Sequence, residues 1–213
     1  MEDKKDVVKK DEKKEEKKEE KKLPFKWPPL ESDPTILTEF MQKLGMPKSW
    51  ELSEVLGLEP DFLAIVPKTS VAFVLAYDYK GGSEEASKEK KIVPEVDYYM
   101  LQCGNLDNAC GLIACIHAVF NNLSHIKLLP GSPLDKFWTQ SCKLNPKERA
   151  DTLDGCEEIQ AAHDKCGHEG QSEFVEEADE TKYHFICFTR NKAQQLVELD
   201  GIIGTPITLK GSK

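Results

Sequence analysis

The stretch DNACGLIACIHAVFNN, residues 107–122, constrains the fold of this chain more than any other feature. From Leu112 to Phe120 it is apolar on nearly every side of a helix, which predicts a central helix buried on all faces. Apolar runs typical of strands occur at 71–77, 96–102, 184–189 and 196–200. Helical spacing or capping signals mark 34–44, 53–58, 60–66, 133–143 and 146–161. Strands beside buried helices predict an α/β or α+β domain.

Residues 1–22 differ from the rest of the chain, with 10 Lys against 9 Asp or Glu and almost nothing to bury. We expect a disordered charged tail there and one folded domain over 23–213. The whole chain has a formal net charge of −9, so the excess of acidic charge belongs to the domain. An acidic domain argues against nucleic acid as the main partner and suits a partner that offers basic residues.

The cellular location is predicted from signals for secretion and membrane insertion, which we do not find in this sequence. The first 22 residues contain no apolar run typical of a signal peptide, and no segment approaches the length of a membrane span. Seven cysteines, an odd number with no secretory context, indicate reduced thiols. We therefore expect a cytoplasmic and also nuclear protein that makes no contact with membranes.

Two cysteines lie on the predicted central helix, and their positions differ in chemistry. Asn108 is expected to cap the helix, and Cys110 then lies in its first turn, where free N–H groups and the helix dipole favour a thiolate. Cys115 lies more than a turn further along among apolar residues, where burial keeps a thiol neutral. Cys103 lies beside a turn with no helix to activate it. The sequence therefore favours Cys110 as a nucleophile.

The base for such a nucleophile has to come from another part of the chain. His117 lies roughly 10 Å from Cys110 along the helix axis, at about 1.5 Å per residue, so we interpret it as a structural residue. His184 begins one predicted strand and Asp200 ends the next, and a hairpin centred on Lys192 would place them opposite each other. Two interpretations are then equally supported: a Cys–His–Asp triad, or a surface His and an unrelated Asp in a turn.

Two further segments carry polar residues. Residues 162–182 show neither helical nor strand periodicity, which predicts a long loop of the kind that often covers a site. A metal site is an alternative for the Cys and His residues near this loop, but their spacing matches structural zinc sites poorly, and no metal or cofactor is expected. The residues concerned are Cys156, His163, Cys166 and His168.

Several motifs in a fixed order resemble the UCH family, the ubiquitin C-terminal hydrolases, which are papain-like cysteine deubiquitinases. NACG with Cys110 resembles the nucleophile motif, HFI at 184–186 the catalytic histidine segment, and ELDG at 198–201 the catalytic aspartate segment. HEGQS at 168–172 resembles the family's active-site crossover loop, and WPPLE at 27–31 its N-terminal segment. The resemblance runs from about Trp27 to about Gly201.

The resemblance implies an αβα arrangement, classed as α+β, with a central antiparallel sheet flanked by helices. It implies a monomeric enzyme that cleaves small adducts or peptides from the C-terminal glycine of ubiquitin, with the ubiquitin-like protein Nedd8 as a second candidate substrate. Cys110, His184 and Asp200 would be catalytic. The implied substrate-binding residues are Trp27, Pro29, Leu30, Glu31, Glu169 and Gly170.

The chain departs from the family pattern at two places. Family members place an oxyanion-stabilising glutamine six residues before the nucleophile, where this chain has Gly104, and the nearest glutamine is Gln102. An insertion that loops out would leave Gln102 in place. Family members also continue past the LDG segment with a helix and a strand, so the C-terminus is expected to be truncated. Both departures keep a second reading open, a catalytically weak protein that binds and sequesters ubiquitin.

Overall fold

The structure is a computed structural model that describes residues 24–79, 94–169 and 183–209. The charged tail expected at 1–22, Gly170 and the remainder of the loop expected up to residue 182 lie outside these residues. The helices are α1 (Pro34–Leu44), α2 (Pro60–Ile65), α3 (Cys110–Phe120), α4 (Pro133–Ser141), α5 (Pro146–Asp154) and α6 (Glu157–Glu169). The strands are β1 (Ala72–Asp78), β2 (Tyr183–Arg190), β3 (Leu196–Leu199) and β4 (Ile207–Thr208).

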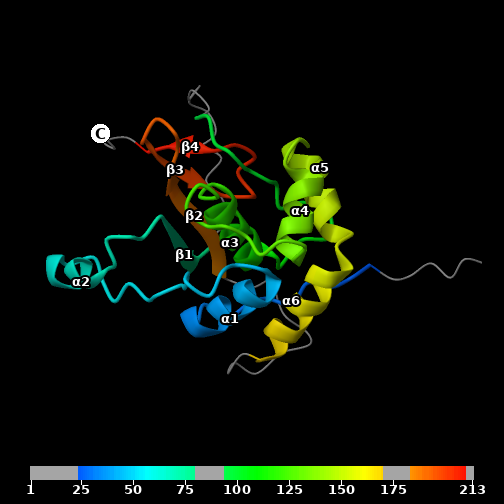
Figure 1. The fold of residues 1–213 in the computed structure, drawn as a ribbon, viewed down its shortest axis with the longest axis horizontal. Helices are drawn as coiled ribbons and strands as arrows, with labels where there is room; N and C mark the ends of the chain where they lie inside the picture. Colours follow the sequence, from blue (N-terminus) through cyan, green and yellow to red (C-terminus); the bar gives the residue numbers. More distant parts are fainter. Residues whose placement is uncertain (1–23, 80–93, 170–182, 210–213) are drawn as a thin grey trace, which may run out of the picture.

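The four strands form one antiparallel sheet in the order β1-β2-β3-β4, which confirms the predicted α+β class. Helix α3 packs on β1 and β2, and α4, α5 and α6 lie on the same side of the sheet as α3 (Figure 1). Helix α2 lies apart from them, beyond β1 (Figure 1). None of the described helices combines the length and the apolar character that a membrane crossing requires.

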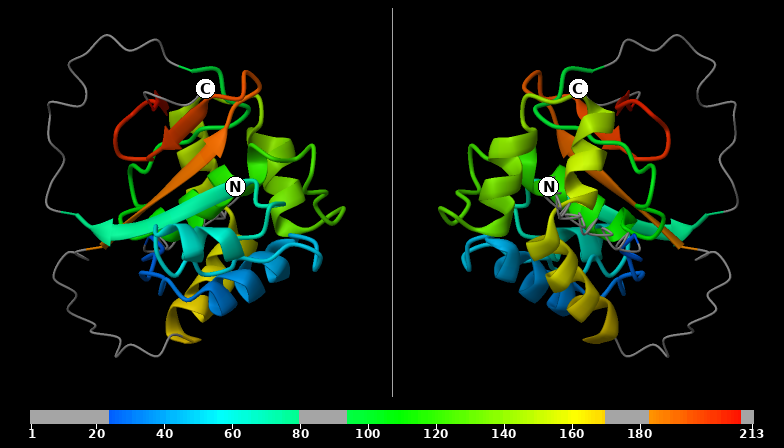
Figure 2. Two further views of the ribbon diagram at one scale, coloured as in Figure 1. Left: turned by 90° about the vertical axis from the view of Figure 1, so that its left-hand side faces the viewer. Right: turned by 90° about the vertical axis from the view of Figure 1, so that its right-hand side faces the viewer.

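The two faces of β1 have different surroundings because side chains alternate along a strand. Val74 and Ala76 pair with Cys187 and Phe185 and face the core on the side of α3. On the other face Leu75 is 45% exposed, as Phe73 nearly is, so this part of the sheet is open in the described structure. The side views show β1 along the border of the sheet (Figure 2).

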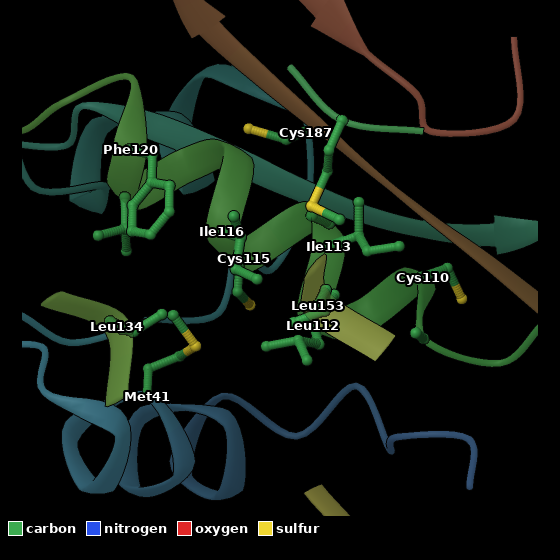
Figure 3. Packing of buried hydrophobic residues seen from close by; sticks show 14 of the residues in the cluster. Met41, Cys110, Leu112, Ile113, Cys115, Ile116, Phe120, Leu134, Leu153 and Cys187 are labelled. Atoms are coloured by element: carbon green, nitrogen blue, oxygen red, sulfur yellow. The ribbon is translucent and has the colours of Figure 1, made fainter. Parts of the chain in front are cut away.

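The predicted central helix is confirmed, since ten of the eleven residues of α3 are buried. Figure 3 shows Leu112 and Ile116 of α3 among Met41 of α1 and Leu134 of α4, with Cys110 at the opposite end of the helix from Phe120. Because α3 is held by apolar contacts on every side, the position of its first residue is fixed by the whole core.

The segment 96–102 is not a strand, contrary to the prediction. It is extended and its aromatic residues are buried, but its backbone groups are satisfied by side chains and by other loops. The Tyr98 N–H donates to Asn121 Oδ1 at 3.1 Å, and the Met100 N–H donates to His117 Nε2 at 3.0 Å. Alternating apolar residues indicate an extended, buried segment, but they do not tell which groups complete its hydrogen bonds.

Two helix predictions and one loop prediction need correction. The helix predicted for 146–161 is divided, because Gly155 ends α5 and α6 begins at Glu157. Helix α6 continues to Glu169 and so takes up the first part of the loop expected over 162–182. Its buried face consists of Ile159, His163 and Cys166. Because His163 and Cys166 carry polar groups, the sequence shows no apolar repeat at helical spacing there and predicts a loop instead. Residues 53–58 form no helix.

Candidate active site

Cys110 is the first residue of α3 and is 7% exposed. The cap residue before it is Ala109, which makes no side-chain cap hydrogen bond, so the expectation that Asn108 caps the helix is wrong. The first turn of a helix has backbone N–H groups without intrahelical partners, and Cys110 begins that turn. The catalytic candidate Cys110 is therefore placed by the same buried helix that forms the centre of the core.

His184 and Asp200 come together at the sheet, as the triad hypothesis predicts. The His184 Nε2–H donates to Asp200 Oδ1 at 2.8 Å, and both side chains are buried. The predicted register is wrong by two residues, because Cys187 pairs with Leu199, so that position 200 falls opposite Ile186. The two side chains still meet because residues 184 and 186 lie on the same face of β2, and a diagonal neighbour is within reach of a long side chain.

The ring of His184 lies between Asp200 and Cys110. Burial alone lowers the pKa of His184, but hydrogen bonds with Asp200 and with the Cys110 thiol, together with their charges, raise it to about 9. Since Nε2 holds Asp200, Nδ1 is the ring nitrogen that remains for Cys110. The arrangement stabilises an imidazolium next to the sulfur, which is the charge state that supports a thiolate nucleophile.

Asp200 is held by contacts that the sequence did not predict. Its Oδ1 also accepts from the Ile202 N–H at 2.9 Å, and its backbone carbonyl accepts from the Tyr99 hydroxyl at 2.7 Å. The neighbouring Gly201 carbonyl accepts from the Gln102 N–H at 2.9 Å. Nothing in the periodicity of 96–102 identifies Tyr99 as a support for the site, because its ring is buried like those of its neighbours.

Gln102 lies beside the turn that follows Asp200. A Cβ added to Gly201 would meet the Gln102 Cβ at 2.9 Å, so glycine is needed for this close approach. The Gln102 Nε2 donates to the Asp107 carbonyl at 2.7 Å, and among the described atoms its buried Oε1 has no hydrogen-bond partner. Gly104 has a φ of +69° in the turn between Gln102 and α3, which is the place where the expected insertion would loop out.

The second cysteine of α3, Cys115, and the one histidine of that helix, His117, are structural, as predicted. Burial, followed by the nearby Cys166, raises the pKa of Cys115 to about 12. Burial lowers the pKa of His117 to about 4, although hydrogen bonds oppose this shift. The His117 ring stacks on Tyr99 with centroids 5.3 Å apart. Both side chains therefore stay neutral near pH 7 and serve the core.

The WPPLE segment packs against the first turn of α3. Trp27 is 3% exposed and its Nε1–H donates to Asp154, while Leu30 is buried against Gly111, where an added Cβ would lie 3.3 Å from the Leu30 Cβ. Pro29 and Glu31 are half-buried. Trp27 and Leu30 thus belong to the core beneath the site, and Pro29 and Glu31 are the members of this segment closer to the surface.

The remaining predicted residues lie around α6. Helix α6 ends at Glu169, whose side chain lies outside the described residues, as does Gly170. Two of the candidate metal ligands have hydrogen-bond partners within the protein. The His163 Nε2–H donates to the Pro28 carbonyl at 2.7 Å, and the Cys156 thiol donates to the Thr152 carbonyl at 3.2 Å. Within the described ranges, no three His, Cys, Asp or Glu residues are grouped as a metal site requires.

Two further residues at the site were missed. Tyr77 and Tyr79 both have ring contacts with His184. Tyr77 is the last residue of the predicted strand 71–77 and Tyr79 lies two residues further on, a spacing that in extended backbone indicates a shared face. Nothing in the sequence pattern indicates, however, that this strand pairs with the strand that carries His184.

Comparison with known proteins gives a consistent result. The model of a family described as "Ubiquitin carboxyl-terminal hydrolase, family 1" matches residues 27–213. Ubiquitin carboxyl-terminal hydrolase isozyme L1 of Monodelphis domestica is 37% identical over 186 residues, which are 84% of this chain and 80% of the relative. A ubiquitin carboxyl-terminal hydrolase of Aplysia californica is 33% identical over 184 residues and 85% of each chain.

A solved structure shares the fold. It is the catalytic domain of UCH37 from Trichinella spiralis, which was crystallised bound to ubiquitin vinyl methyl ester. The TM-score is 0.62 at 23% sequence identity, and the match covers 86% of this chain and 78% of that one.

Proposed function

The chain belongs to family 1 of the ubiquitin carboxyl-terminal hydrolases, and from this premise we propose that it is a cysteine-type deubiquitinase that cleaves small adducts or peptides from the C-terminal glycine of ubiquitin. The observation that carries the proposal is the hydrogen bond from His184 to Asp200 beside the thiol at the start of α3. Three residues from three separate elements meet in the order that thiol hydrolysis needs.

In the first half of the reaction, the Cys110 thiolate attacks the carbonyl carbon of the terminal glycine. The C–N, C–O or C–S bond to the adduct breaks, and the His184 imidazolium gives its proton to the leaving group. Asp200 keeps the ring oriented and stabilises its charge while the proton is held. The products of this step are the free adduct and a thioester between ubiquitin and Cys110.

In the second half, neutral His184 takes a proton from a water molecule as the water attacks the thioester carbon. The C–S bond breaks, ubiquitin leaves with a free carboxyl group that gives its proton to solvent, and the Cys110–His184 pair returns to its thiolate–imidazolium starting state. The negative oxygen formed in each half needs hydrogen-bond donors. The Cys110 backbone N–H and the Gln102 side-chain amide are the donors that we propose.

Substrate binding is proposed from charge and from position. The domain carries the acidic excess of the chain, and the arginines in the tail of ubiquitin offer complementary charge. We propose that Pro29 and Glu31 contact the tail, with Trp27 and Leu30 supporting them from the core. Glu169 and Gly170 remain proposed contacts from the sequence resemblance alone. A crossover segment after α6 would limit the size of the leaving group. Nedd8 is the second candidate substrate.

The test is labelling of the full chain by ubiquitin that carries a C-terminal electrophile, followed by mass spectrometry. Wild type is expected to form one covalent adduct, which Cys110→Ala abolishes and Cys142→Ala retains, because Cys142 is a half-buried cysteine away from the site. The absence of an adduct in protein that is folded by circular dichroism would overturn the enzyme proposal. Size-exclusion chromatography of the same sample tests the expected monomer, and a fluorescent fusion in cells tests the expected cytoplasmic and nuclear location.

One observation favours a second function. The Gln102 amide donates one N–H to the Asp107 carbonyl, which leaves a single N–H of this amide for the oxyanion site. Losing one such donor typically costs about 10²–10³ in rate. Hydrolysis of a fluorogenic ubiquitin substrate close to background, together with retained ubiquitin binding, would identify a ubiquitin-sequestering protein instead.

A further inference from the structure

Two tyrosine rings lie against the imidazole of His184. The ring centroids of Tyr77 and His184 are 5.9 Å apart with an interplanar angle of 76°, and those of Tyr79 and His184 are 5.3 Å apart at 56°. Tyr77 lies directly opposite His184 in the ladder between β1 and β2. Tyr79 follows the strand two residues later, on the same side, because strand side chains alternate. Both tyrosines are half-buried, and together they cover the side of His184 that faces β1.

The groups around His184 come from three elements. Asp200 approaches from the end of β3, Cys110 from the start of α3, and the two tyrosines from β1. An aromatic ring attracts a cation whose position is within about 6 Å of the ring centroid, and the attraction grows when water is excluded. Both ring distances fall within that limit.

The Tyr77 hydroxyl stays neutral in this setting. Burial, followed by the charges of Asp200 and Glu198, raises the pKa of Tyr77 to about 12. Tyr77 therefore presents an uncharged ring to His184 over the range in which the enzyme works, and any effect on the imidazole comes from the ring and its packing.

We propose that Tyr77 and Tyr79 are positioning residues, which hold the imidazole of His184 in line between Asp200 and Cys110 and stabilise its protonated form. The proposal deepens the proposed function, since it concerns the same Cys–His pair, but its test needs no ubiquitin. It assigns a role to the end of β1 that the catalytic motifs do not include.

The variants separate the ring from its bulk. Tyr79→Leu and Tyr77→Leu remove the aromatic face but keep apolar volume, so His184 stays shielded from water. Tyr79→Phe keeps the ring and removes the hydroxyl. Tyr183→Leu is the matched control, because Tyr183 precedes His184 in β2 and is 66% exposed.

The measurement is the pH dependence of Cys110 alkylation by iodoacetamide in the full chain, read by mass spectrometry. Each Leu variant at the pair should move the midpoint of thiolate formation upward by about half to one pH unit, which slows alkylation about threefold to tenfold below the midpoint. Tyr79→Phe and Tyr183→Leu should match wild type. The His184 ring protons, followed by NMR, should titrate at lower pH in the Leu variants.

The outcomes that overturn the proposal are defined in folded protein. An unchanged midpoint in Tyr79→Leu would show that the rings only fill space, and a Tyr79→Phe shift as large as that of Tyr79→Leu would assign the effect to the hydroxyl. If Tyr77→Leu fails to fold, Tyr79→Leu alone decides, because residue 79 lies beyond the end of β1. Wild type that alkylates as expected but does not hydrolyse ubiquitin substrates would remove the proposed function and leave this proposal standing.

Discussion

Helix α3 has a cysteine and a neighbouring histidine at its first turn, Cys110 with His184 of β2, and another such pair in its interior, Cys115 and His117, and all four side chains are buried. At the first turn, the pKa of His184 rises to about 9 although burial lowers it, because hydrogen bonds with Asp200 and Cys110 and the charges of these two groups favour the protonated ring. In the interior, the pKa of His117 falls to about 4, because burial outweighs its hydrogen bonds. Burial alone makes a histidine inert, and burial together with a carboxylate keeps it charged and ready to transfer a proton.

The largest expected effect comes from removing that carboxylate. Asp200→Asn should lower kcat for a fluorogenic ubiquitin substrate by about 10³–10⁴, because His184 loses both its orientation and the stabilisation of its charge. Asp151→Asn is the control, since Asp151 is exposed and pairs with Lys147 on α5. A loss of kcat smaller than tenfold would mean that turnover does not depend on the carboxylate that distinguishes His184 from His117.

The next effect concerns the oxyanion. Gln102→Ala should reduce kcat by about 10²–10³ with little change in KM, because its amide has a second N–H besides the one that donates to Asp107. Asn105→Ala, in the same loop, should have no comparable effect on kcat. Equal kinetics for Gln102→Ala and wild type would leave the Cys110 N–H as the main donor.

The two histidines should also act on stability at opposite ends of the pH scale. The raised pKa of His184 stabilises the fold fully below pH 6.5, and this stabilisation is lost as the pH rises through about 9. The lowered pKa of His117 gives stability that is present above pH 6.5 and is lost as the pH falls toward about 4. Each contribution is about 1–3 kcal/mol.

Urea unfolding across pH checks these opposite slopes. His184→Ala should flatten the free energy of unfolding between pH 6.5 and 9, and His117→Gln should flatten part of its decline below pH 6.5. His163, whose pKa is also lowered to about 4 by burial, adds to the acid slope. A His184→Ala curve parallel to wild type on the alkaline side would contradict the assignment.

The smallest effect is expected at the inert cysteine. Cys115→Ala should lower the free energy of unfolding by about 1 kcal/mol, because it removes one sulfur from a packed core, and turnover per folded molecule should not change. Thermal unfolding and active-site titration measure the two quantities separately. A clear drop in turnover would show that the interior of α3 transmits changes to Cys110.

Much of this arrangement could be predicted from the sequence. The apolar run of α3, the cap of α1 at Asp33 and the capping box of Asn145 and Glu148 are local patterns, and all three are present in the structure. The pairing of His184 with Asp200 could be predicted only approximately, because turn geometry sets a hairpin register. Here Gln194, at a φ of +62°, lies in the turn that moves the register by two residues.

The supports of the site could not be predicted, because they depend on contacts between distant segments. Tyr99 reaches the carbonyl of Asp200 across 101 positions of sequence, and the Tyr79 ring meets His184 although it lies beyond its strand. The backbone of 96–102 uses the side chains of His117 and Asn121 in place of a neighbouring strand. Periodicity identifies which residues are buried, and tertiary packing decides which partners they find.

The distance along the chain between Cys110 and Asp200 has a consequence for biosynthesis. The thiol leaves the ribosome long before β2 and β3, so a growing chain carries the nucleophile without a complete triad until residue 200 has been made and the sheet has closed. Contacts of such sequence separation form late in folding. Catalytic competence therefore marks the completion of folding, and partly folded chains cannot act on substrates.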